Sequence, residues 1–108
     1  MKIALLGYGR MGKAIEKFAV DRAHEIVYIK DNEEIRGNLS QANIAINFSV
    51  PKAAVENIKS ALKKQIPVVC GTTGWLENYH DIVTFCNIQK SGFLYASNFS
   101  IGVNLFFK

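Results

Sequence analysis

Three glycines near the start of the chain have the spacing of a loop that binds a diphosphate. Gly7, Gly9 and Gly12 form a G-x-G-x-x-G motif directly after an apolar run and directly before a helical pattern. The first glycine can take a tight turn, the second lets the backbone approach a diphosphate, and the third lets the helix pack closely on the sheet. The helix start also offers unpaired N–H groups and a positive dipole end. The residues expected to contact a dinucleotide here are Gly7, Tyr8, Gly9, Arg10, Met11 and Gly12.

An acidic residue follows at the distance expected for ribose binding. Asp31 lies 19 residues after Gly12, where a carboxylate can accept hydrogen bonds from both hydroxyls of the adenosine ribose. A plain loop aspartate is the alternative, because other acidic residues stand nearby. The carboxylate would repel the 2′-phosphate of NADPH, whereas Lys30 and Arg10 could offset that repulsion. Both NADH and NADPH therefore remain candidate cofactors.

Three further segments follow predicted strands and are expected at the same edge of the sheet. Bare backbone and hydroxyl groups in the first suit a flat amide such as the nicotinamide carboxamide, although a turn with a helix cap would need the same residues. That segment comprises Gly71, Thr72 and Thr73. A short polar segment would lie near the nicotinamide end, and it comprises Ala96, Ser97, Asn98 and Phe99. Phe48 is expected either to pack against the cofactor or to belong to the core.

The chain carries no residue pattern typical of a catalytic centre. His24 and His80 are its two histidines, and their places at a helix end and on a helix flank predict surface positions away from the crevice. There is no Ser-His-Asp order, no lysine placed for a Schiff base and no metal-ligand spacing. Cys70 and Cys86 are predicted to be buried thiols. We therefore expect a cofactor-binding site without a reaction centre of its own.

Alternating apolar runs and helical periodicities must position these residues. Strands are predicted at residues 2–6, 25–29, 43–48, 67–70 and 93–95. Helices are predicted at residues 10–22 and 53–64 and over an apolar stripe from Leu76 to Cys86, with Ser49 capping the second of them and residues 32–41 as a loop. This alternation predicts a doubly wound parallel α/β sheet, a Rossmann-like NAD(P)-binding domain over residues 1–108.

Composition and charge exclude several other classes of protein. The 108 residues are 49% hydrophobic and 20% charged, as in an ordinary soluble domain. The net charge of +4 favours anionic ligands, but the basic residues are scattered and lack the interleaved aromatics of a nucleic-acid surface. The first apolar run is too short for a signal sequence or a membrane span, so we expect a cytoplasmic protein that binds neither nucleic acid nor membrane.

Four segments together resemble the dihydrodipicolinate reductase family of lysine and diaminopimelate biosynthesis. They read G-Y-G-R-M-G at residues 7–12, I-N-F-S-V-P at 46–51, V-C-G-T-T-G at 69–74 and S-N-F-S-I-G-V-N at 97–104. The resemblance implies that the glycine loop, Asp31, Phe48, residues 71–73 and residues 96–99 line an NAD(P)H site. It also implies hydride transfer to a cyclic dicarboxylate.

The sequence departs from that family in three ways. The glycine loop is one residue shorter than in many relatives, and Asn47 stands where many have aspartate. The resemblance does not extend to the family's substrate domain with its histidines and lysine. We therefore expect the cofactor domain alone, inactive without the rest and able to form homo-oligomers through the apolar run at residues 103–107. The alternatives are a stand-alone NAD(H)-binding or redox-sensing module and a homoserine- or semialdehyde-type dehydrogenase.

Overall fold

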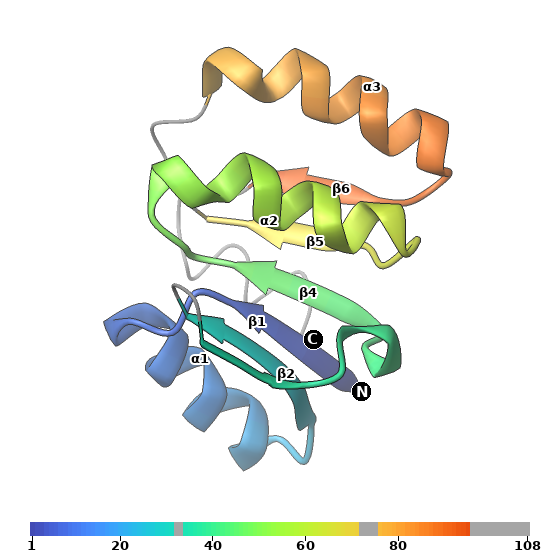
Figure 1. The fold of residues 1–108 in the computed structure, drawn as a ribbon. Helices are drawn as coiled ribbons and strands as arrows, with labels where there is room; N and C mark the ends of the chain where they lie inside the picture. Colours follow the sequence, from blue (N-terminus) through green and yellow to red (C-terminus); the bar gives the residue numbers. More distant parts are fainter. Residues whose placement is uncertain (32–33, 72–75, 96–108) are drawn as a thin grey trace.

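The computed structural model describes residues 1–31, 34–71 and 76–95. Strands and helices alternate along nearly the whole of this part of the chain (Figure 1). In chain order they are β1 (Lys2–Leu6), α1 (Arg10–Asp21), β2 (Glu25–Asp31), β3 (Glu34–Gly37), the 3-10 turn η1 (Leu39–Gln41), β4 (Ile44–Asn47), α2 (Pro51–Lys63), β5 (Val68–Cys70), the 3-10 turn η2 (Leu76–Asn78), α3 (Tyr79–Gln89) and β6 (Phe93–Tyr95).

The strands form one sheet in the order β3-β2-β1-β4-β5-β6. All its pairings are parallel except that between β2 and β3. Helix α1 covers one face, and α2 and α3 cover the other (Figure 1). The predicted doubly wound, Rossmann-like arrangement is thus confirmed, with one antiparallel strand at its edge.

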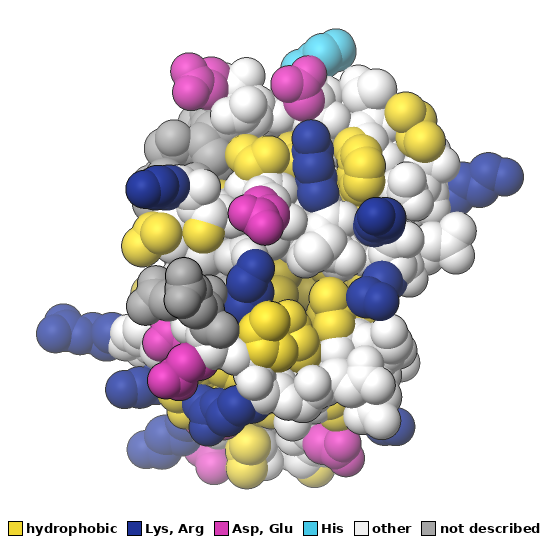
Figure 2. All heavy atoms as spheres, viewed as in Figure 1, with side chains coloured by type: hydrophobic (Ala, Val, Ile, Leu, Met, Phe, Trp, Pro, Cys, Tyr) yellow, Lys and Arg dark blue, Asp and Glu magenta, His cyan; other side chains and the backbone are white. Residues whose placement is uncertain are grey.

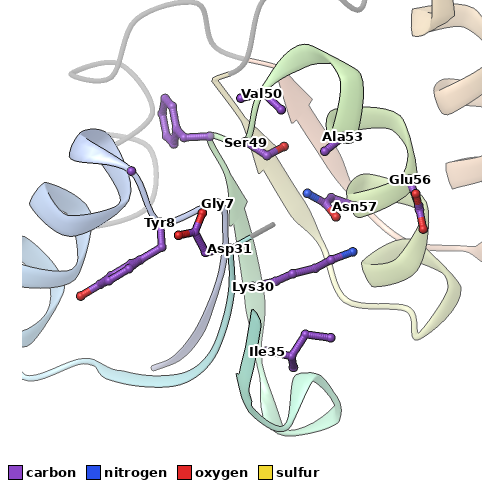
Figure 3. A pocket seen from close by; sticks show the side chains of 12 residues that line it. Gly7, Tyr8, Lys30, Asp31, Ile35, Ser49, Val50, Ala53, Glu56 and Asn57 are labelled. Carbon is purple, nitrogen blue, oxygen red and sulfur yellow. The ribbon is translucent and has the colours of Figure 1, made fainter. Parts of the chain in front are cut away.

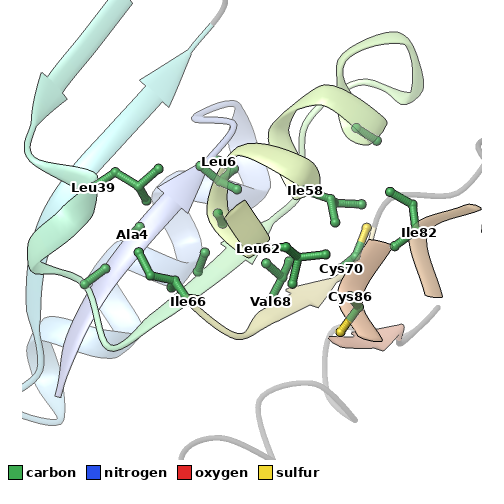
Figure 4. Packing of buried hydrophobic residues seen from close by; sticks show 14 of the residues in the cluster. Ala4, Leu6, Leu39, Ile58, Leu62, Ile66, Val68, Cys70, Ile82 and Cys86 are labelled. Carbon is green, nitrogen blue, oxygen red and sulfur yellow. The ribbon is translucent and has the colours of Figure 1, made fainter. Parts of the chain in front are cut away.

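Strand β1 lies at the centre of the sheet and supplies side chains to both cores. Ile3 and Leu5 pack in a cluster with residues of α1. Ala4 and Leu6 point to the other face, where they join a larger cluster with α2 and α3 (Figure 4). All four side chains are at most 1% exposed, which explains why this strand reads as a continuous apolar run rather than an alternating one.

The segment after β2 differs from its prediction as a loop. Residues Glu34–Gly37 pair antiparallel with β2, with Asp31 opposite Glu34 and Tyr28 opposite Gly37. All four residues of β3 are exposed. The segment therefore lacks the alternation of apolar and polar residues that predicts a half-buried strand. It forms because the edge of β2 offers backbone hydrogen bonds, which depend on position in the sheet rather than on side-chain pattern.

The start of α2 also differs from the prediction. The N-cap is Val50, and Pro51 occupies the first helical turn, where a missing N–H costs nothing. Ser49, which was expected to cap the helix, instead donates a hydrogen bond from Oγ to Oδ1 of Asn47, at 2.8 Å.

The cysteines and histidines lie mostly where the sequence predicts. Cys70 and Cys86 are buried free thiols, and burial raises the pKa of Cys86. His80 is exposed, whereas His24 is half-buried between α1 and β2 rather than on the surface. Basic and acidic side chains are interspersed over the face drawn in Figure 2, with apolar side chains visible between them. Within the described ranges, no helix is both long and apolar enough to cross a bilayer.

Each α-helix in the described part of the chain ends at a residue with a left-handed backbone. Ala23, Gln65 and Lys90 have φ angles of +63°, +60° and +55°. After α1, the amide of Ala23 donates to the carbonyl of Val20 at 3.0 Å, and that of His24 donates to Ala19 at 2.9 Å. This is the Schellman pattern, which normally takes glycine at the left-handed position.

Glycine at this position is therefore predicted to stabilise the fold. We expect Ala23→Gly to raise the free energy of unfolding by about 1 kcal/mol, because a side chain disfavours the left-handed region. Ala14→Gly, at an exposed position within α1, should lower it by about the same amount. Urea unfolding measures both variants, and a loss of stability in Ala23→Gly would contradict the prediction.

Candidate functional site

A cleft of about 690 Å³ lies at the carboxyl ends of β1, β2 and β4. This is the edge at which open parallel sheets bind ligands, and the volume suits a sizeable small molecule. The glycine loop and the end of β2 border it on one side, and α2 borders it on the other (Figure 3). The lining residues are Gly7, Tyr8, Gly9, Lys30, Asp31, Ile35, Phe48, Ser49, Val50, Ala53, Glu56 and Asn57.

The three glycines of the loop have different physical roles. Gly7 has a φ of +106°, and a Cβ there would lie 2.7 Å from the backbone nitrogen of Ser49. A Cβ on Gly12 would lie 2.6 Å from the carbonyl oxygen of Gly7, so that glycine lets α1 pack against the loop. Around Gly9, by contrast, no atom of the described residues other than its two chain neighbours lies within 4 Å of the Cβ position. The open space at Gly9, the N-cap of α1, is where an anion could meet the helix amides.

Asp31 is the last residue of β2 and lies beside this loop. The amide of Gly7 donates to the carbonyl of Lys30 at 2.7 Å, which ties the loop to the strand end. The Asp31 carboxylate lies beside Gly7 and Tyr8 in Figure 3, and the side chain of Lys30 extends across the cleft toward α2. The structure therefore brings the predicted ribose-binding carboxylate and the glycine loop into one cleft.

Phe48 both borders the cleft and packs on the core. It contacts the cluster that contains Ile3 and Leu5, and it also lines the cleft. A Cβ built on Gly71 would overlap the Phe48 ring, so the ring lies directly on the backbone after β5. Both of the roles considered for Phe48 are compatible with this position.

A buried amide joins the ends of β4 and β5 beneath the cleft. Asn47 has no exposed surface. Its Nδ2 donates to Sγ of Cys70 at 3.3 Å, and its Oδ1 accepts from the Ser49 hydroxyl. These hydrogen bonds hold together the points at which the chain leaves β4 and β5. The sequence singled out Asn47 only as a difference from related proteins, because the pairing with Cys70 spans 23 residues.

Tyr8 forms one wall of the cleft and contacts three charged side chains. Its hydroxyl donates to Glu16 at 2.5 Å, and the cationic groups of Arg36 and Lys13 lie 5.1 and 5.7 Å from its ring centroid. The pKa of Tyr8 is raised, first by the hydrogen bond to Glu16 and then by burial and the charge of Glu16, while Arg36 acts in the opposite direction. The phenol therefore stays neutral near pH 7 and supplies no base.

Not every predicted contact residue lines the cleft. Arg10 and Met11 are exposed at the start of α1, and Gly12 is buried beneath the loop. Gly71 lies against the Phe48 ring but does not itself line the cleft. The remaining candidates lie outside the described residues, namely Thr72, Thr73, Ala96, Ser97, Asn98 and Phe99.

Sequence reasoning missed the contribution of α2. Val50, Ala53 and Asn57 are spaced three and four residues apart, so they form one stripe along the start of the helix. The one signal in the sequence for a contribution of α2 was Asn57, a polar residue next to Ile58 on the apolar stripe of the helix. Ile35 was missed because β3 was not predicted.

Comparison with known proteins identifies the family. Residues 1–99 match the family model described as dihydrodipicolinate reductase, N-terminus. Over 100% of its length the chain is 51% identical to the 4-hydroxy-tetrahydrodipicolinate reductase of Christiangramia forsetii. The chain belongs to the dihydrodipicolinate reductase family. Another relative, the reductase of Cutibacterium acnes, is 34% identical over 97% of the chain. The chain spans less than half of these reductases, 46% and 44% of their lengths.

Solved structures of similar fold come from another family. A hyperthermophilic archaeal homoserine dehydrogenase in complex with NADPH has a TM-score of 0.69 and 15% identity, covering 87% of this chain and 43% of its own. The homoserine dehydrogenase of Thermoplasma acidophilum has a TM-score of 0.68 and 15% identity, covering 88% and 42%. At such low identity the likeness shows the fold alone. The family match, in contrast, decides against the homoserine-type alternative.

The different roles of the loop glycines can be tested by measuring the free energy of unfolding of single-site variants. We expect Gly12→Ala to lower the free energy of unfolding by about 1–3 kcal/mol, because its Cβ meets backbone that cannot easily move. Gly9→Ser should change it by less than about 0.5 kcal/mol, since the site is open and serine is a good N-cap. Denaturant unfolding measures both, and equal effects would contradict this assignment.

Proposed function

We propose that this chain is the NAD(P)H-binding domain of a dihydrodipicolinate reductase. In that role residues 1–108 hold the hydride donor for reduction of a cyclic dicarboxylate in lysine and diaminopimelate biosynthesis. The observation that carries the proposal is the open space at Gly9 and the start of α1, with Asp31 in the same cleft. Family membership supports the reaction class.

The proposed binding mode assigns each part of the dinucleotide to a segment of the chain. The diphosphate would lie over Gly9 against the amides of α1, and the adenosine ribose would bind Asp31. The nicotinamide would extend past Phe48 and Gly71 toward residues 72–73 and 96–99. Reduced nicotinamide supplies a hydride when it is bound. The residues of this chain would orient it and exclude water from one side.

Substrate binding and protonation are assigned to another part of the reductase. The described part of the cleft holds Lys30, Asp31 and Glu56 as its charged residues, and in this binding mode all three lie beside the adenosine half of the cofactor. An acid that protonates the substrate must lie near the nicotinamide. We therefore propose that this domain positions the cofactor while the proton donor comes from elsewhere in the longer protein.

The proposal is tested first at the diphosphate. Gly9→Val should raise the dissociation constant for NADH at least tenfold, because a branched side chain would occupy the diphosphate path. Isothermal titration calorimetry measures it, with a wild-type value expected between micromolar and millimolar. Gly92→Ala, at an exposed glycine before β6, is the control. Absence of binding of both NADH and NADPH by the wild type would overturn the proposal.

The cofactor preference depends on the charge at the end of β2. We propose that the site accepts both cofactors, with Asp31 favouring NADH and Lys30 and Arg10 offsetting its charge. Asp31→Ala should weaken NADH more than NADPH, changing their ratio of dissociation constants about tenfold, because it removes the ribose acceptor and relieves repulsion of the 2′-phosphate. Asp21→Ala, at the far end of α1, is the control. Equal losses for the two cofactors would contradict this role.

A further inference from the structure

A buried amide on α2 borders the cleft. Asn57 is 3% exposed, and its Oδ1 has no partner among the described residues. The residue lines the cleft, and Figure 3 shows its side chain directed from α2 toward the space beside Lys30. An unsatisfied buried acceptor is costly to folding, so each one in a native structure calls for an explanation.

Two apolar side chains that line the same cleft are largely exposed, where polar side chains would be usual. Ile35 and Val50 line the cleft and are 58% and 60% exposed. Ala53 lies between Val50 and Asn57 on the same stripe of α2. A ligand part that suits this environment has flat apolar faces and a polar edge. Purine bases have this combination.

The position of Asn57 relative to the glycine loop indicates that this purine would be the adenine of the cofactor. In Figure 3 the Asp31 carboxylate lies beside Gly7, and the side chains of Lys30 and Ile35 lie farther from Tyr8. A dinucleotide with its diphosphate at Gly9 and its ribose at Asp31 would therefore direct its base toward α2. We propose that Asn57 reads the polar edge of the cofactor's adenine, an inference that rests on the proposed function. The amide oxygen accepts from the 6-amino group, and the amide nitrogen donates to an adjacent ring nitrogen. Lys30, on its flexible stem, moves aside to admit the base.

A purely structural role would predict a different response to substitution. Leucine has nearly the shape of asparagine and needs no hydrogen bond, so Asn57→Leu removes an unsatisfied buried group and should leave stability unchanged or raised. Its cofactor affinity should nevertheless fall, because the base loses its partner. Higher stability combined with weaker binding is the expected signature of a ligand-binding residue.

The experiment measures binding of three ligands to the purified protein by calorimetry. They are NADH, its analogue in which hydrogen replaces the 6-amino group of adenine, and reduced nicotinamide mononucleotide, which has no adenylate half. The wild type should bind NADH about tenfold more tightly than the analogue. Asn57→Leu should bind both alike, with its affinity for the mononucleotide unchanged. Asn57→Ala is a second variant. Ser60→Ala is the control, because the Ser60 hydroxyl donates to the backbone carbonyl of Asn57 at 2.7 Å and not to its side chain.

The outcomes separate this inference from the proposed function. Equal wild-type binding of NADH and the analogue overturns the adenine role, and so does discrimination that persists in both Asn57 variants. In either case NADH binding that is sensitive to Gly9→Val leaves the proposed function standing. A wild type that binds no NADH overturns both. Loss of discrimination in the Asn57 variants but not in Ser60→Ala supports the inference.

Discussion

The close approach of Gly7 to the backbone of Ser49 is the constraint on which the site depends. Because no side chain separates them, the loops after β1 and β4 lie against each other at the carboxyl edge of the sheet. The same residue donates to the Lys30 carbonyl, and its own carbonyl leaves no room for a side chain on Gly12. One backbone segment thus sets the relative positions of three strand ends and the first turn of α1.

The parts of the fold that the sequence predicts are those with local causes. The run from Ile3 to Leu6 and the apolar stripes of the helices depend on burial, which has a period along the chain. The glycine loop depends on steric exclusion at single positions. Strand β3 depends instead on the free edge of β2, and its residues carry no apolar period. The Ser49 hydroxyl likewise donates to Asn47 rather than capping α2, because the turn after β4 directs it toward the end of that strand.

The candidate site was predicted in the same uneven way. Gly7, Gly9 and Asp31 belong to a motif of fixed spacing, so their meeting in one cleft follows from the order of strands and helices. Asn57 lies far from them in sequence, and its amide resembles any polar position of a helix until the sheet brings α2 against the cleft. Its burial and its missing partner are properties of the folded chain alone.

Strand β3 links the cleft to the behaviour of the sheet edge. Its four residues end the sheet on one side and contribute Ile35 to the cleft and Arg36 to the neighbourhood of Tyr8. A short edge with alternating charge, Glu34 and Arg36 on either side of Ile35, is also a poor template for pairing with another polypeptide. Variation that adapts this hairpin to a different ligand will therefore change the protection of the sheet against intermolecular strand addition, so recognition and resistance to aggregation must evolve together here.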